Sequence, residues 1–145
     1  MNTGIIISGH GHFASGIASS LDLIMGIPEN LVIIDFPDGD NIDHLQLEFD
    51  SAVKSFKDEE IIIFVDIFSG SPFNVAMRLA MQNPHIHLYY GTNLGMLMET
   101  LTKIKFSDNL KEVLDEIVKI GKDQVGHFNP ESVNSDDSND EDDDL

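Results

Sequence analysis

The sequence contains no cysteine, which excludes disulfide bonds and thiolate chemistry and fits a reducing compartment. It also has no apolar run of the length that a membrane-spanning helix needs. The short apolar stretch near the N-terminus follows no basic residue, so it predicts a first strand rather than a signal peptide. These absences favour a cytoplasmic protein that is not inserted in a membrane.

Basic residues are scarce, because 8 Lys and Arg side chains stand against 26 Asp and Glu, for a net charge of −18. Such a charge excludes nucleic acid as a partner, since one polyanion repels another. Residues 131–145 hold eight of the acidic side chains and no basic one, which leaves −10 (−18 plus 8) on the rest of the chain. We interpret residues 1–130 as one domain and residues 131–145 as a disordered acidic tail. The charge indicates either a basic protein partner or only a need for solubility, and composition leaves both open.

Apolar segments rich in β-branched residues predict the strands of a sheet. The third segment is apolar throughout, which is typical of a central strand, whereas the fourth alternates and favours a place nearer an edge. A fifth, short strand is expected near the C-terminus. The segments are 5–7, 31–35, 61–66, 85–90 and 125–128.

Apolar residues recur at helical spacing between these strands. The first predicted helix ends at Gly26, and the third has Ser71 as its N-cap and Pro72 at its first position. A short helix is expected around 96–101, and a last amphipathic helix has Gly121 as its C-cap. Strands that alternate with helices predict an α/β fold with a mainly parallel sheet. We expect the strand order 2-1-3-4, with helices on both faces.

Four loops follow the carboxyl ends of the predicted parallel strands, where ligands bind in open α/β sheets. Within them, His10 closes the first strand and Asp66 closes the third. Neighbouring strands lie about 5 Å apart, so the Asp66 carboxylate is expected to accept a hydrogen bond from one His10 nitrogen. The other nitrogen is then a nucleophile that can take up a phosphoryl group, and Asp66 stabilises the charge that develops on the ring. The Ser71 hydroxyl and the backbone N–H groups beside it are expected to bind phosphoryl oxygens. The loops are 8–12, 35–41, 66–72 and 91–95.

Two further absences define the kind of phosphate chemistry. The sequence has no Gly-x-x-x-x-Gly-Lys-Ser/Thr loop for a nucleoside triphosphate. None of the four loops contains Lys or Arg, and the only arginine is Arg78. A site that holds phosphate tightly usually has such a cation, so we predict a transient phosphoryl carrier that needs no metal or other cofactor.

At this point the motifs resemble those of a known family. The chain resembles the IIA component of the mannose/fructose/sorbose class of the bacterial phosphoenolpyruvate-dependent sugar phosphotransferase system (PTS). The resemblance covers about residues 1–125 and rests on the order and spacing of three blocks. These are Ile5-Ile6-Ile7-Ser8-Gly9-His10-Gly11, Val65-Asp66 with Ser69-Gly70-Ser71-Pro72-Phe73-Asn74, and Gly91-Thr92-Asn93-Leu94-Gly95-Met96.

The resemblance implies the partners of the reaction. His10 would receive its phosphoryl group from phosphorylated HPr, on the ring nitrogen distal to the backbone, and donate it to a separate IIB component. It also implies a homodimer in which the segment 125–128 is exchanged as a strand between subunits. Four other residues of the matching blocks would line the substrate site: Gly11, Ser69, Gly70 and Asn93.

Other interpretations remain open at this stage. One alternative is a phosphotransfer domain that acts for dihydroxyacetone kinase, because the first domain of that kinase's phosphotransfer subunit is similar to this family. The spacing Gly9-His10-Gly11-x-x-Ala14, with Asp35 further on, also matches a dinucleotide-binding fingerprint, although the chain is short for such an enzyme. A third hypothesis is a regulatory protein that acts through its acidic tail.

Three further interpretations concern single residues of the predicted site. His10 and His12 could suggest a metal pair, but no third ligand is fixed by spacing. His10, Asp66 and Ser71 are the residue types of a hydrolase triad, but the sequence lacks a Gly-x-Ser-x-Gly elbow. Ser71 fits a helix cap as well as a phosphoryl contact.

Overall fold

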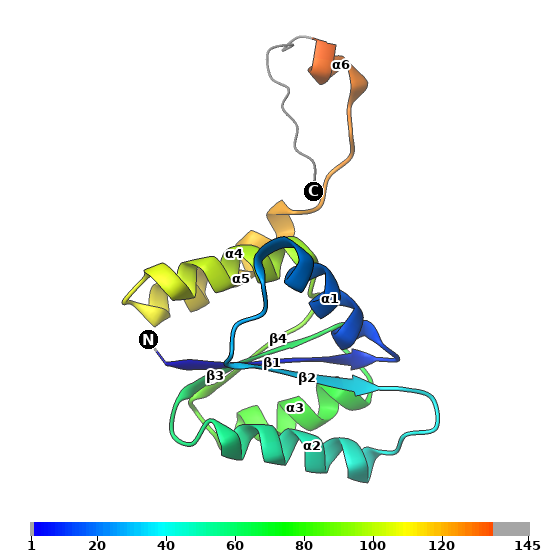
Figure 1. Cartoon of the computed structure of the whole chain (residues 1–145), viewed down its shortest axis with the longest axis vertical. Coiled ribbons are helices and arrows are strands. Elements are labelled where there is room, and N and C mark those ends of the chain that lie inside the picture. Colours follow the sequence, from blue (N-terminus) through cyan, green and yellow to red (C-terminus); the bar gives the residue numbers. More distant parts are fainter. Residues whose placement is uncertain (1, 135–145) are drawn as a thin grey trace.

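The structure is a computed structural model, and it describes residues 2–134. Strands and helices alternate as far as the fourth strand, and helices alone follow it (Figure 1). The strands are β1 (Thr3–His10), β2 (Leu31–Phe36), β3 (Glu60–Val65) and β4 (Ile86–Tyr89). The helices are α1 (Phe13–Met25), α2 (Ile42–Ser55), α3 (Ser71–Gln82), α4 (Leu94–Phe106), α5 (Leu110–Asp123) and α6 (Pro130–Asn134).

The four strands form one parallel sheet in the order β2-β1-β3-β4, which confirms the predicted order. In the register, Ile5 of β1 lies opposite Leu31 of β2 and Ile62 of β3. β1 extends through His10 rather than ending at residue 7, so His10 belongs to the strand itself and lies opposite Phe36. The sheet therefore places His10 at the same edge as the residues that follow β3.

Helices cover both faces of the sheet, as predicted (Figure 1). Alternate residues of β1 point to opposite faces. Ile5 and Ile7 pack in a core with residues of α1, α4 and α5, whereas Ile6 packs in a second core with residues of α2 and α3. β1 and β3 are the two central strands of the sheet, and residues on both of their faces are buried.

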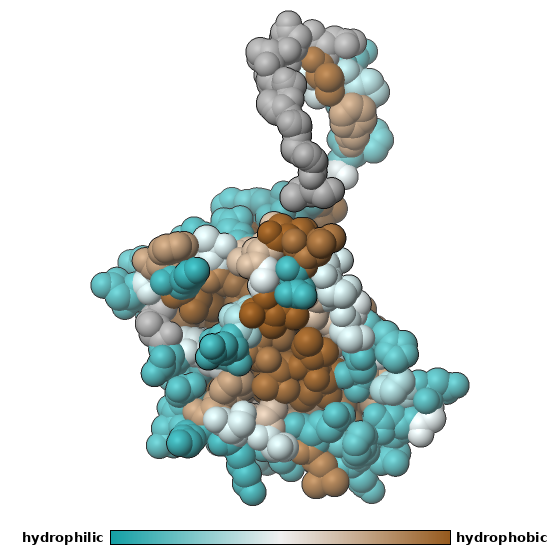
Figure 2. Space-filling model, in the orientation of Figure 1, coloured by the Kyte–Doolittle hydropathy of each residue, from teal (hydrophilic) through white to brown (hydrophobic). Residues whose placement is uncertain are grey.

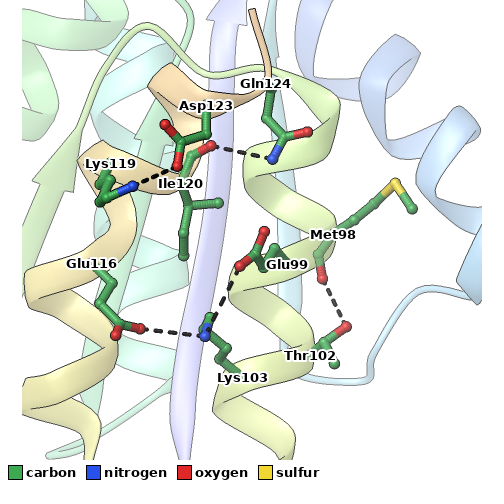
Figure 3. A network of polar contacts seen from close by, with 9 residues as sticks. All are labelled: Met98, Glu99, Thr102, Lys103, Glu116, Lys119, Ile120, Asp123 and Gln124. Carbon is green, nitrogen blue, oxygen red and sulfur yellow. Dashed lines mark hydrogen bonds and ion pairs between the residues drawn. The ribbon is translucent and has the colours of Figure 1, made fainter. Parts of the chain in front are cut away.

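A network of polar contacts joins α4 to α5 on their outer side (Figure 3). The ammonium group of Lys103 lies 3.4 Å from a carboxylate oxygen of Glu116 on α5 and 3.9 Å from one of Glu99 on its own helix. Both carboxylates are about half exposed, so these pairs contribute little to stability. The buried apolar residues beneath them hold the two helices on the sheet.

Three details of the helices differ from the sequence predictions. α4 is a full helix of 13 residues rather than a short one. Gly121 is not the C-cap of α5, because it is buried inside that helix against Met96 and the C-cap is Gln124. A Cβ at Gly121 would lie 3.0 Å from the Met96 methyl carbon, so a small residue is needed there for packing and not to end the helix.

The predicted fifth strand is not formed within the chain. Residues 125–129 have no regular structure, and both Val125 and Phe128 are exposed. A strand needs a neighbour for its backbone groups, and the described part of the chain offers this segment none. The described start of the predicted acidic tail is the short helix α6, and residues 135–145 lie outside the described residues.

The sheet has two open edges, at β2 and at β4. Figure 2 shows apolar residues in the middle of the face that presents the β2 edge, where Ile33 is partly exposed. A groove of about 490 Å³ lies beside the β4 edge, lined by residues such as Leu88, Tyr90 and Val118. Within residues 2–134, no helix combines the length and the apolar character needed to cross a membrane.

Candidate functional site

His10 and Asp66 meet at the carboxyl edge of the sheet, as the strand order predicts. The Nδ1 atom of His10 lies 2.8 Å from Oδ2 of Asp66, and the backbone N–H of His10 donates to the same oxygen at 2.9 Å. An ionised carboxylate only accepts hydrogen bonds, so Nδ1 carries the proton and Nε2 of the neutral ring has a free lone pair. The His10 side chain is 43% exposed, which leaves this nucleophile open to a partner.

The surroundings of Asp66 keep its carboxylate charged. Burial alone would raise the pKa of Asp66, but hydrogen bonds from the backbone and side chain of His10 and from the backbone N–H of Ile67 lower it below 3.8 overall. The side chain is only 13% exposed, so its charge is directed at His10 with little screening by solvent. This pair can stabilise a positive charge on the imidazole.

Backbone pairing fixes the position of His10 from the other side. Gly11 donates its N–H to the carbonyl of Phe36 at 2.8 Å and accepts the Phe36 N–H at 3.2 Å, just beyond the β1–β2 ladder. The Phe36 ring packs edge-on against the His10 ring at a centroid distance of 6.4 Å. Gly9 is required beneath them, since a Cβ there would lie 2.7 Å from the Phe13 ring and 2.9 Å from the Asp66 carboxyl carbon.

Gly70 lies directly at the nucleophilic nitrogen. It is the N-cap of α3 with φ 92° and ψ −179°, a backbone conformation essentially restricted to glycine. A Cβ at this position would lie 2.5 Å from Nε2 of His10. The absence of a side chain therefore leaves room at Nε2, beside a helix N-terminus that favours negative charge.

The prediction that Ser71 is the N-cap of α3 is wrong by one residue. Ser71 is the first residue of the helix, Gly70 is the cap, and no side-chain hydrogen bond caps this end. The Asn74 N–H donates to the Gly70 carbonyl at 2.9 Å and closes the first turn of α3. The Ser71 hydroxyl is not used as a cap, and its contact with phosphoryl oxygens stays a prediction.

The loop after β4 is tied to the end of β3 and to the start of α4. The Gly91 N–H donates to the Asp66 carbonyl at 3.1 Å, and the Thr92 hydroxyl donates to the Val65 carbonyl at 2.7 Å. Asn93 caps α4 by accepting the Met96 N–H at 2.9 Å, and its amide donates to the Gly121 carbonyl at 3.1 Å. Asn93 therefore caps α4 and joins it to α5. Its predicted place in the substrate site stays a prediction.

A second His–Asp pair, which the sequence analysis did not predict, lies at the same edge of the sheet. The Nδ1 atom of His12 lies 3.3 Å from Oδ2 of Asp35, and the Ser15 N–H donates to the other Asp35 oxygen at 2.9 Å. Burial raises the pKa of Asp35, but these hydrogen bonds with Ser15 and His12 lower it overall. Asp35 thus binds the first turn of α1, where a dinucleotide fingerprint would have it contact a ribose.

Comparison with known proteins shows the family of the chain. A family described as PTS system fructose IIA component matches residues 4–118. The chain belongs to this family. As a PTS IIA component of the mannose/fructose/sorbose class, it takes part in phosphoryl transfer during sugar uptake.

Individual relatives support the assignment. The PTS fructose-specific EIIA component of Bacillus subtilis (strain 168) is 33% identical over 114 residues, which are 78% of this chain and 77% of the relative. The PTS mannose-specific EIIAB component of Escherichia coli (strain K12) is 29% identical over 126 residues, which are 86% of this chain and only 39% of that longer protein. The crystal structure of a PTS component EIIA from Streptococcus agalactiae superposes with a TM-score of 0.79 and 32% identity over 87% of this chain and 97% of that one.

An exposed aromatic cluster adjoins the site of this IIA component, and the sequence analysis missed it. Phe68, Phe73 and Tyr90 pack against one another with ring centroids 4.7–5.9 Å apart. Phe68 is 63% exposed, and Ile67 beside it is 51% exposed. Phe68 follows Asp66 in the β3–α3 loop, Phe73 lies in the first turn of α3 and Tyr90 precedes Gly91, so the three rings form one apolar surface on the segments that build the site. Contiguous exposed apolar surface of this kind is typical of a protein contact.

Proposed function

We propose that this chain is a cytoplasmic phosphocarrier that accepts a phosphoryl group from phosphorylated HPr on Nε2 of His10 and passes it to a separate IIB component. One observation carries the proposal. The Asp66 carboxylate accepts a hydrogen bond from the protonated Nδ1 at 2.8 Å, which leaves Nε2 unprotonated beside the open space at Gly70. Family membership supports the donor and the acceptor, since IIA components act within the PTS.

The chemical step follows from this geometry. The Nε2 lone pair attacks the phosphorus, the bond between phosphorus and the donor breaks, and its electron pair leaves with the donor. Nδ1 keeps its proton throughout, and the imidazolium that forms is stabilised by Asp66. Transfer to the acceptor is the same step in reverse, with Nε2 as the leaving group. No group at the site has to gain or lose a proton permanently.

The environment of Nε2 favours brief residence of the phosphoryl group. The N-terminus of α3 offers free backbone N–H groups, and Ser71 offers a hydroxyl at its first position. No Lys or Arg occurs in the loops 8–12, 66–72 and 91–95, so no full positive charge from these loops holds the group in place. The phosphoryl group is therefore bound well enough to be aligned and weakly enough to move on.

The aromatic cluster of Phe68, Phe73 and Tyr90 supports transfer between proteins. A phosphoryl group can pass directly between two side chains only if both proteins exclude water around the reacting atoms. An exposed apolar surface on the segments around Asp66 and Gly91 suits that contact, and the strongly acidic chain attracts a basic partner at a distance. We assign this surface to the contact with HPr and with the IIB component.

We also propose that the chain forms a homodimer through the β4 edge. The edge of β4 is unpaired within the chain, the groove beside it is lined by apolar residues, and the segment 125–128 is exposed and irregular. Exchange of that segment as a strand would bury Phe128 and complete the ladder of a second copy. Light scattering of the Phe128→Asp variant tests this, because a dimer that survives the substitution at full strength contradicts strand exchange.

Labelling with radioactive phosphoenolpyruvate in the presence of enzyme I and HPr tests the carrier function. We expect acid-labile phosphate on the wild type and on His12→Ala, and none on His10→Ala. Labelled protein should then lose its phosphate when a IIB component is added. Labelling that persists in His10→Ala would refute the proposal. Transfer of the label only to dihydroxyacetone kinase would show that the acceptor is that kinase and not a IIB component.

A further inference from the structure

A cluster of metal-ligating side chains lies away from His10, where the β2–α2 loop enters α2. Asp40, His44 and Glu48 each offer one ligand atom, and these three atoms lie within 4.8 Å of one another. The spacing of four residues places the three side chains on one side of the helix start. Among residues 2–134 this is the one such group of three or more side chains.

Local hydrogen bonds hold the donors of this cluster in place. Nδ1 of His44 lies 2.8 Å from Oδ1 of Asp40 and 3.9 Å from Oε1 of Glu48, so the imidazole stands between two carboxylates. The Asn41 side chain accepts the His44 N–H at 2.9 Å and fixes where α2 begins. His44 is 56% exposed and Asp40 only 11%, so the cluster has a fixed base and an open outer side.

The charges of the cluster are only partly compensated. Across the described residues, neither Asp40 nor Glu48 forms an ion pair with Lys or Arg, and both share the one imidazole of His44. Two carboxylates and one imidazole therefore face a common point that accepts positive charge. A cation placed there would relieve the repulsion between the carboxylates.

We propose that Asp40, His44 and Glu48 bind a divalent first-row transition-metal ion such as Zn²⁺ or Co²⁺. One imidazole nitrogen and two carboxylate oxygens match the ligands these ions take in proteins, and three protein ligands leave further positions for water. On binding, Nδ1 gives up the proton that it shares with Asp40 and coordinates the ion, and Nε2 takes up a proton from solvent, so the ring stays a neutral ligand. Mg²⁺ should bind poorly, because it prefers oxygen ligands in strict octahedral geometry.

The metal site is independent of the phosphocarrier function and has no part in the transfer step. Its structural consequence is a cross-link between the β2–α2 loop and the first turns of α2. Because the ion binds the folded arrangement of the donors, it should raise the thermal midpoint of unfolding. The rise should depend on His44 and should disappear at acid pH, where protons compete for the imidazole and the carboxylates.

Titration of the ¹⁵N-labelled full chain with Co²⁺ tests the proposal. We expect saturable binding with the largest paramagnetic shifts at the amides of residues 40–48, unchanged by excess Mg²⁺. His44→Ala should weaken binding at least about tenfold, as even supporting residues of metal sites do, and Glu48→Gln should weaken it as well. His127→Ala, which removes an exposed histidine outside the cluster, should bind like the wild type.

Three results would overturn the proposal. The first is the absence of saturable Co²⁺ binding to the wild type. The second is paramagnetic shifts centred on the acidic segment 131–145, which would indicate non-specific attraction of cations. The third is equal affinity in His44→Ala, with circular dichroism confirming that this variant is folded. His44 is more than half exposed and lies outside both cores, so the substitution should leave the fold intact.

Discussion

Gly70 has two roles in the structure: its backbone adopts a positive φ, and its lack of a side chain leaves room at Nε2 of His10. Substitution of Gly70 by alanine, compared with a matched control, separates the two. The backbone of Gly70 adopts φ 92°, and a Cβ would lie 2.5 Å from Nε2 of His10. Gly39→Ala is the matched control, because Gly39 has a similar φ of 90° but no atom within 4 Å of its Cβ position. Both variants carry backbone strain, and only Gly70→Ala also collides with the proposed nucleophile.

The expected magnitudes follow from strain and displacement. A residue with a side chain in this backbone region costs about 1–3 kcal/mol, which lowers the thermal midpoint by about 3–10 °C in a domain of this size. Relief of the collision requires the His10 ring or the Gly70 backbone to shift by about 1 Å, because ordinary van der Waals contact begins at 3.4 Å. A displacement of this size at reacting atoms lowers rates by about 100-fold.

The assay measures both quantities on purified variants. Differential scanning calorimetry gives the thermal midpoints, and quenched-flow labelling from phosphorylated HPr gives the rate of phosphorylation. We expect both variants to be destabilised, with a rate loss of about 100-fold in Gly70→Ala and almost none in Gly39→Ala. Equal rates for Gly70→Ala and Gly39→Ala would refute the assignment of Nε2 as the reacting atom.

Four further outcomes concern Asp66, Ser8 and Gly4. Asp66→Asn should slow phosphorylation by about 10–100-fold, because a charge-assisted hydrogen bond of about 1.5–3 kcal/mol is lost, and quenched-flow labelling measures this. The pKa of Asp66 lies below 3.8, so the stability it contributes is complete above that value and is lost as the pH falls through the folded pKa. Urea midpoints from pH 7 to pH 3 should therefore fall less steeply in Asp66→Asn than in the wild type. Ser8→Ala should leave the urea midpoint unchanged or raise the free energy of unfolding by up to about 1 kcal/mol, because the buried Ser8 hydroxyl has no partner among the described residues. Gly4→Ala should lower the urea midpoint by a free energy of at least about 1–3 kcal/mol, because its Cβ would overlap the Phe56 ring, and a loss near zero would contradict that packing.

The sheet and the His10–Asp66 pair could be predicted because they depend on strong local patterns. β-branched runs define β1 and β3, and parallel neighbours bring the residues at their carboxyl ends together. The helix that begins near Ser71 could also be predicted from Pro72, which fits the first turn of a helix. Pattern alone placed the cap at Ser71 rather than Gly70, because a serine is the commoner cap and a positive φ leaves no clear sign in the sequence.

What could not be predicted depends on contacts between distant segments. Gly121 was interpreted as a helix end, but Met96 of another helix packs against it and keeps it inside α5. The segment 125–128 has the residues of a strand, but a strand forms only where a neighbour offers backbone groups. The aromatic cluster around Phe68 joins two loop residues to Phe73 of α3, and Tyr90 lies far from the other two in the sequence, so no spacing along the chain reveals it. The spacing of apolar residues predicts which face of a helix or strand is buried, but it does not predict which other element packs against that face.

The position of the phosphoryl group on the protein tests the central claim most directly. Long-range ¹H–¹⁵N correlation spectra of the chain phosphorylated by HPr distinguish the two nitrogens of each histidine ring. We predict a phosphoryl group on Nε2 of His10, with Nδ1 still protonated and bonded to Asp66. A phosphoryl group on Nδ1 of His10 would contradict the account, because that nitrogen donates a hydrogen bond to the Asp66 carboxylate. A phosphoryl group on His12 would contradict it as well, because His12 has no part in the proposed transfer.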